Sequence, residues 1–261
     1  MKRENKTNGK PHYVGVGTVL LLVILCVGFL LLSAGDRSMD SGEIPEMLLR
    51  AFRVTGFSLS TAIVAESLSL PLCISLAMLV TMIAPEKIRR PLERLASGFS
   101  AIPAVVLGYM SLKFYVPKIA SPWWAVVVTL LLMSLMEQTL DFIRINSRQS
   151  ALMERAFALG ANRMETAVVF VYPQVKRGYL LTAISTLVRD LSEGVAILLV
   201  LSHYEQEADT LSTAIMKAVG VTKTPGKLQW VLILVLLLFL LSELIRSLSS
   251  MLRKGGKGYE A

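Results

Sequence analysis

The chain has 261 residues, 54% of them hydrophobic and 18% charged, and its mean hydropathy is +0.59. This composition exceeds what a soluble domain usually tolerates and indicates a membrane protein. The net charge of +8 does not indicate a nucleic-acid partner, because the basic residues gather in the gaps between apolar runs. The two cysteines lie within apolar runs and the two histidines are isolated, so neither a disulfide nor a metal site is predicted.

Six apolar runs approach the roughly 20 residues that a helix needs to cross a bilayer. Backbone polar groups in lipid must be bonded internally, so each run is expected to be helical. The first run has no small-residue cleavage pattern behind it and predicts a retained anchor rather than a signal peptide. The predicted fold is therefore all-α, a polytopic transmembrane bundle of about six helices, at residues 14–34, 57–84, 99–116, 123–143, 179–202 and 228–248.

Lysine and arginine are distributed unevenly between the gaps. They are dense in the N-terminal tail (residues 1–13), in residues 85–97, in residues 144–178 and at the C-terminal end, and sparse in the other gaps. Cytoplasmic loops of membrane proteins carry the basic excess. Both termini and the two basic loops are therefore predicted to be cytoplasmic, in a multi-pass protein surrounded by membrane lipid.

The second basic loop contains the stretch "MERAFALGANRMETAVVFVYP", residues 153–173. Strong helix formers precede Gly160, a typical helix stop signal. Asn162 and Glu165 have the spacing of a capping box, which would begin a second helix that Pro173 ends or bends. The stretch therefore predicts a rigid helical elbow on the cytoplasmic face. Its apolar residues need a surface to receive them, and they include Ala156, Leu159, Ala167 and Val168.

The fifth apolar run contains "TAISTLVRDLSEGVAI", with three charged residues that are costly in lipid and normally face a cavity or a partner. Arg189 and Glu193 are four residues apart and share a predicted helix face with Ser185 and Ser192. We expect this stripe to line a transport pathway, because the planar fork of Arg189 suits an oxyanion. The alternative is a buried ion pair that only fixes helix packing. Asp190 points elsewhere, to Arg189 of another subunit or to no identified group.

The elbow resembles the coupling loop of ABC importer permeases, the segment that docks into the ATPase subunit. The matching positions are Glu154, Ala156, Gly160 and Pro173, with Arg155 in place of the usual first alanine. The resemblance implies a type I ABC importer permease (MetI-like) fold. It implies a permease domain with five transmembrane helices at residues 57–248, a coupling loop at residues 147–173, and a cytoplasmic tail at residues 249–261.

Further stretches are similar to the phosphate-type branch of these permeases, namely "LSLPLCISLAML", "SAIPAVVLGYMSL" and "RDLSEGVAILLV". This resemblance implies inorganic phosphate as the cargo, with Arg189 and Glu193 on its path. It also implies a bacterial inner membrane, a second permease subunit that is identical or paralogous, two ATP-binding subunits that hold ATP and Mg, and an extracytoplasmic substrate-binding protein. No cofactor and no catalytic residue are expected on this chain. Glu137 departs from the pattern, because family members usually carry proline there.

Three alternatives remain open. An importer of this kind could carry another oxyanion or small solute. Molybdate, sulfate and phosphonate stay open, because one arginine and a few hydroxyls do not discriminate tetrahedral anions. A secondary transporter would also need polar spans. A membrane-embedded hydrolase could use Glu137, Asp141 and Arg189 as acid, base and charge clamp, but no nucleophile has a base at suitable spacing. Neither of the last two explains a docking elbow, so Glu66, Glu137 and Asp141 are assigned to polar packing or a subunit interface.

Overall fold

The structure, a computed structural model, describes residues 43–82, 91, 94, 98, 102–204, 208–220 and 227–254. The predicted anchor and the N-terminal tail lie outside these residues. Every regular element in the described part is a helix, which confirms the all-α prediction for it. In chain order the elements are α2 (Glu43–Met82), α4 (Ala104–Phe114), η1 (Val116–Lys118), α5 (Pro122–Ser147), α6 (Ser150–Ala158), α7 (Arg163–Glu165), η2 (Thr166–Val171), α8 (Tyr172–Ser192), α9 (Val195–Leu201), α10 (Leu211–Gly220) and α11 (Lys227–Lys254).

Two helices of the described part are long and apolar enough to cross a membrane, namely Leu49–Met82 of α2 and the whole of α5. They correspond to the second and fourth predicted runs, and the total of six membrane helices stays a prediction. The α2 helix begins at Glu43, well before the predicted start at residue 57, and Pro71 lies inside it without interrupting it. Neighbouring helices allow proline within such a helix, because they restrain the backbone around the missing hydrogen bond.

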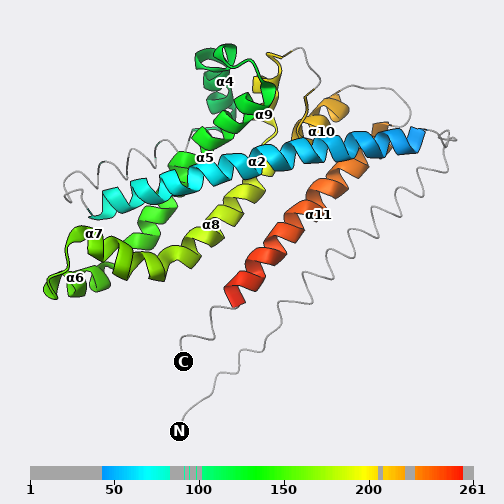
Figure 1. Ribbon diagram of the computed structural model, residues 1–261. Helices are drawn as coiled ribbons and strands as arrows, with labels where there is room; N and C mark the ends of the chain where they lie inside the picture. The colour runs from blue at the N-terminus through cyan, green and yellow to red at the C-terminus, as the bar shows by residue number, and fades with distance from the viewer. Residues whose placement is uncertain are drawn as a thin grey trace, which may run out of the picture.

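The α2 and α5 helices pack together at the centre of the molecule. In Figure 1, α2 runs the length of the described part, α8 and α11 lie below it, and α4 and α9 lie at the top. Small side chains at spacings of three and four residues let the backbone of α2 approach its neighbours closely. These buried positions of α2 are Ala62, Ala65, Ser69, Cys73 and Ala77.

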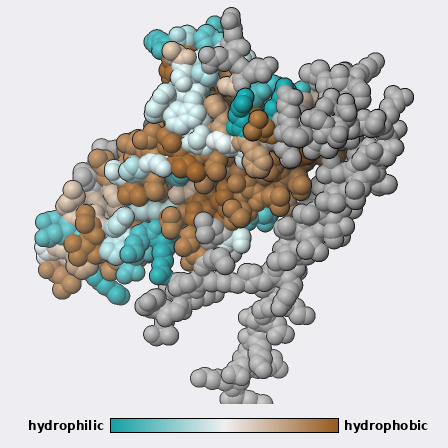
Figure 2. All heavy atoms as spheres, turned by 45° about the vertical axis from the view of Figure 1, so that its right-hand side comes forward, coloured by the Kyte–Doolittle hydropathy of each residue, from teal (hydrophilic) through white to brown (hydrophobic). Residues whose placement is uncertain are grey.

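A neighbouring face of α2 is apolar and exposed. Its leucines are between 38% and 53% exposed, at positions 68, 72, 76 and 79. Figure 2 shows apolar residues dominating the middle of the visible face, with hydrophilic residues gathered at its upper and lower ends. Such a band between polar ends suits a protein whose middle lies in the hydrocarbon of a bilayer.

The third predicted run, residues 99–116, contains α4, whose 11 residues extend only about 16 Å. This is about half of the roughly 30 Å hydrocarbon core. The α4 helix crosses α9 at Gly108, where an added Cβ would lie 2.6 Å from the Cα of Ala196. The two short helices therefore pack backbone to backbone, and together they complete one end of the bundle.

The fifth predicted run, residues 179–202, does not form one continuous helix, and that expectation is wrong. The helices α8 and α9 are separated by Glu193 and Gly194, and Glu193 has an extended backbone (φ −67°, ψ 105°). The carbonyl of Glu193 accepts a hydrogen bond from Ser212 Oγ of α10 at 2.9 Å. Gly194 follows it in close contact with α10, because a Cβ there would lie 2.7 Å from Met216 Sδ and the methionine side chain would have to move. Contact with α10 therefore overrides the helical pattern of the sequence.

Candidate translocation site and coupling elbow

The first helix of the elbow, α6, ends as predicted at Gly160. This residue has a φ of 86°, which is strained for any residue with a Cβ. The amide of Gly160 donates to the carbonyl of Phe157 at 3.0 Å, and the amide of Ala161 donates to the carbonyl of Ala156 at 3.1 Å. These two bonds form a Schellman motif, which satisfies carbonyls at the end of the helix.

The second helix of the elbow begins with the predicted capping box. The amide of Glu165 donates to Asn162 Oδ1 at 2.8 Å, and the amide of Asn162 donates to Glu165 Oε2 at 3.0 Å. Both bonds satisfy amides that the first helical turn leaves without an intrahelical partner. The turn between the two helices is therefore fixed at both ends by local hydrogen bonds.

Pro173 was predicted to end or bend the second helix, and it does not end it. The short helix α7 continues directly into the π-helix η2 and then into α8, with Pro173 in the first turn of α8. The amide of Tyr172 donates to the carbonyl of Ala167, five residues earlier, instead of four. This wider register precedes the proline, whose missing amide is tolerated in the first turn of a helix. The elbow is thus joined to α8 by continuous helical backbone.

The apolar residues of the elbow divide into two groups. Ala156 and Ala167, only 1% and 6% exposed, pack within the chain itself. The others project outwards and form what we call the elbow patch. Its members are Phe157, Leu159, Met164, Val168 and Val169, of which Leu159 is 82% exposed and Met164 73%. Glu154 is also exposed, on α6. The two alanines are therefore buried by this chain itself. Leu159 and Val168 are not, so the prediction that a further surface covers them stays a prediction.

Arg189 of α8 is the centre of the candidate translocation site. Its Nη1 pairs with Glu137 Oε2 of α5, and its Nη2 lies 3.6 Å from Asp190 Oδ1. The predicted pairing of Arg189 with Glu193 is not formed. An i,i+4 pair requires an unbroken helix, and α8 ends just before Glu193. Sequence reasoning had placed Glu137 beside Arg189 only in the hydrolase alternative, and it did not predict this ion pair. The available signal was a carboxylate within an apolar run, at a position where proline is usual.

Asp190 lies behind the guanidinium of Arg189 and is only 2% exposed. Ser134 Oγ of α5 is 3.1 Å from both carboxylate oxygens of Asp190 and donates to them. Arg189 Nη2 in turn lies 3.5 Å from Ser134 Oγ. Asp190 thus pairs within its own chain, where the sequence had suggested another subunit, and it links α8 to α5.

A cavity of about 190 Å³ lies beside the ion pair. Glu137, Arg189 and Glu193 are its charged lining residues. The apolar ones come from α4, from α5 and from the segment just before α4, namely Ile102, Ala104, Leu107, Leu132, Met133 and Met136. Glu193 therefore does share a cavity with Arg189, although through a break in the helix and not through a common helix face. The cavity holds one positive and two negative side chains.

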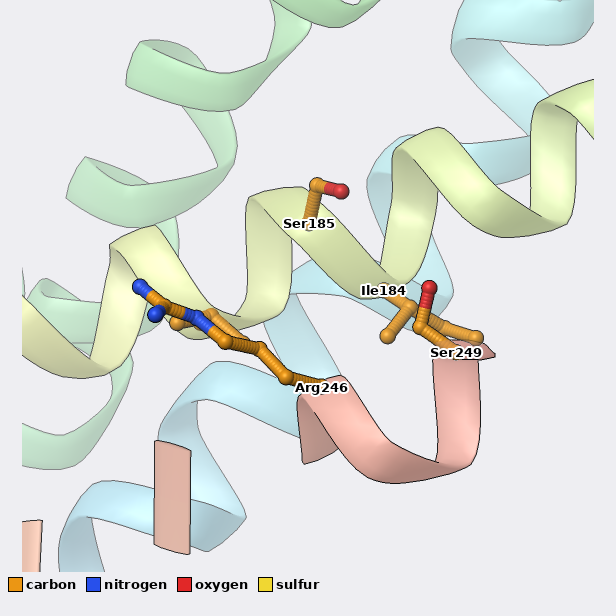
Figure 3. Close-up of a pocket in the computed structure, with 5 residues that line it drawn as sticks. Ile184, Ser185, Arg246 and Ser249 are labelled. Carbon is orange, nitrogen blue, oxygen red and sulfur yellow. The ribbon is translucent and has the colours of Figure 1, made fainter. Parts of the chain in front are cut away.

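The two predicted pathway serines lie elsewhere. Ser192 Oγ donates to the carbonyl of Arg189 at 2.7 Å and does not line this cavity. Ser185 lines a separate cavity of about 260 Å³ between α8 and α11, together with Arg246 and Ser249. Figure 3 shows that the Ser185 hydroxyl is directed away from Arg246. The predicted stripe is thus divided between two cavities.

The other intramembrane carboxylates have their own partners. Glu66 of α2 accepts a hydrogen bond from Gln138 Nε2 at 2.5 Å, and Ser69 Oγ lies 3.2 Å from Gln138 Oε1. Asp141 pairs with Arg144 at 3.0 Å near the end of α5. Glu66 thus takes part in polar packing between α2 and α5, as one of its two predicted roles required.

No protein-family model matches the chain. The chain is 28% identical over 215 residues to a protein of Bacillus subtilis (strain 168) named "Probable ABC transporter permease protein YqgH". The aligned part covers 74% of this chain and 69% of that relative. This similarity and the apolar helices support a membrane-embedded permease subunit of an ABC transporter. The name of this relative specifies no substrate.

Proposed function

We propose that the chain is the permease subunit of an ATP-driven importer and that residues 147–173 couple it to a separate ATPase. The observation that carries this proposal is the elbow patch. It is a group of large apolar side chains, exposed on a turn that local hydrogen bonds hold rigid. A membrane protein exposes such residues at its polar end when a protein partner covers them.

The continuity of the elbow with α8 gives the coupling a physical route. A partner that moves the elbow patch pulls on helical backbone that leads to Arg189 without a flexible loop between them. Two ATP-binding subunits, which hold ATP and Mg, would supply that movement through two permease subunits, identical or paralogous. Binding of ATP then shifts the population between inward-open and outward-open states.

Inorganic phosphate is our proposed cargo, delivered by an extracytoplasmic substrate-binding protein in a bacterial inner membrane with both termini cytoplasmic. The phosphate-type sequence resemblance supports this choice, and Arg189 beside a cavity supplies a cation for a tetrahedral anion. Another oxyanion is the alternative, because the cavity offers this guanidinium and no set of donors specific to phosphate.

Labelled-phosphate uptake tests the cargo, in cells without their own high-affinity phosphate permeases that express this chain with its neighbouring transport genes. We expect ATP-dependent uptake that falls about tenfold or more in Arg189→Gln, because a hydrogen bond to a charged group is lost. Arg144→Gln is the matched control, since Arg144 does not line the cavity and, among the residues that the structure describes, forms an ion pair with Asp141. Absent uptake by the parent chain, with ATP-binding subunits still co-purifying, would exclude phosphate and keep the permease assignment.

A further inference from the structure

Arg189 is held by two carboxylates in very different environments. The Glu137 side chain is 49% exposed, whereas the Asp190 side chain is 0% exposed. Arg189 lies between these extremes, with its side chain 28% exposed. One partner therefore faces the cavity, and the other faces the protein interior.

Asp190 is buried beside Arg189, and moving away would leave its carboxyl group in the protein interior without that partner, which is strongly unfavourable. Ser134 Oγ also bonds both of its oxygens and fixes the carboxylate against α5. Asp190 is accordingly a positioning residue, which orients the guanidinium towards the cavity.

Glu137 is half-exposed, so neither burial nor Ser134 holds it in place as they hold Asp190. Its carboxylate can turn into a cavity of about 190 Å³, several times the roughly 30 Å³ that one water occupies in the liquid. There it would be solvated, so that its release from Arg189 leaves no buried charge without a partner. A half-exposed pair of this kind is also weak compared with a buried one.

The guanidinium is not fully satisfied in the observed arrangement. Arg189 Nε is buried and has no hydrogen-bond partner among the described residues. An oxyanion that approached from the cavity would compete with Glu137 for the same planar fork and has further oxygens to offer. While Glu137 and Glu193 both face the cavity, however, its charged lining carries one positive and two negative groups and disfavours an anion.

We propose that Glu137 is a releasable internal counter-ion of Arg189, which the transported oxyanion must displace to bind. Glu137 thereby lowers the affinity of the resting site for the anion and keeps the site closed until substrate is delivered at high local concentration. This inference rests on the proposed function, because it takes the cargo to be an anion that binds Arg189.

The first test is equilibrium binding of labelled inorganic phosphate to the purified permease–ATPase complex without its substrate-binding protein. In Glu137→Gln the competing charge is gone and the side-chain shape is kept, so we expect about fivefold tighter binding, the value of a partly exposed ion pair. Asp141→Asn is the matched control. It removes a carboxylate from the same helix, outside the cavity, and is expected to leave the Kd unchanged.

The second test does not depend on phosphate. In the same complex, with Cys26 and Cys73 replaced by alanine, Glu137→Cys is labelled with an anionic and with a cationic thiosulfonate. We expect the anionic reagent to be favoured, because Arg189 is no longer occupied, and the ratio of the two rates to fall at least about threefold on adding Arg189→Gln. The ratio, unlike either rate, is not changed by the reactivity of the thiol itself.

The outcomes separate the two proposals. Tighter phosphate binding in Glu137→Gln together with an Arg189-dependent labelling ratio supports the counter-ion. Unchanged or weaker binding in that variant overturns it. If neither the parent protein nor Glu137→Gln binds phosphate, phosphate is the wrong cargo. The labelling ratio alone then tests whether Glu137 is the counter-ion of Arg189. A ratio insensitive to Arg189→Gln then overturns the counter-ion as well.

Discussion

Gly108 shows how a single residue determines which helices meet. Its hydrogen atom faces the backbone of α9, with an added Cβ 2.6 Å from Cα and 2.8 Å from the carbonyl oxygen of Ala196. Backbone atoms, unlike the end of a flexible side chain, cannot move aside alone. The α4 helix, and with it one wall of the Arg189 cavity, therefore depends on glycine at this position.

Gly108→Ala is expected to lower the free energy of unfolding by about 1–3 kcal/mol, because the added methyl overpacks the crossing. Thermal unfolding of the purified protein in detergent measures this change. Gly56→Ala is the matched control, since a Cβ at that position in α2 has nothing within 4 Å. It should be neutral or stabilise by up to about 1 kcal/mol through helix propensity. Equal midpoints for the two variants would show that α4 and α9 are not in close contact.

At the scale of elements, the elbow is a turn stabilised by its own residues. The Schellman motif at Gly160 and the capping box of Asn162 and Glu165 both use bonds between residues at most five apart. Their energies are therefore independent of the rest of the bundle, and a change in them is expected to loosen the elbow alone.

Asn162→Ala should cost about 1 kcal/mol of local stability, because the amide of Glu165 loses its acceptor. Hydrogen exchange followed by mass spectrometry is the measurement, and we expect about fivefold faster exchange in the first turn of α7 and η2, with the thermal midpoint little changed. Asn162→Ser keeps a capping oxygen and should restore slow exchange. Slow exchange in the alanine variant would mean that packing, and not the cap, holds the turn.

At the level of the whole molecule, the elbow patch is an exposed apolar surface at one end of the described part. In Figure 1, α6 and α7 project at one end of the described part, away from α9 and α10. A partner bound there would contact the chain without covering the cavity at Arg189. This separation suits a coupling surface, which transmits movement and takes no part in substrate binding.

Leu159→Glu is expected to reduce co-purification of the ATP-binding subunits by about tenfold or more, because a charge replaces a large apolar side chain at the centre of the patch. Pull-down of the tagged chain after co-expression measures it. Val219→Glu of α10 is the matched control, with 64% exposure and the same chemical change outside the elbow patch. Equal recovery of the ATP-binding subunits with both variants would contradict the elbow as the docking site.

The features that depend on near neighbours can be predicted from the order of the residues. Helical content follows from the apolar runs, and the turn at Gly160 and Asn162 follows from residues whose partners lie within five positions. The similarity to a permease also needs no tertiary structure, because it is a similarity of sequence.

The pairing of the charged residues, in contrast, depends on how the helices pack. An i,i+4 spacing joins Arg189 to Glu193 only in an unbroken helix, and Ser212 of α10 binds the carbonyl of Glu193 where that helix ends. Arg189 is then paired with Glu137, which is distant in sequence and close in space because α5 packs against α8. Electrostatic energy depends on distance and burial in the folded chain, and residue spacing specifies neither once a helix breaks.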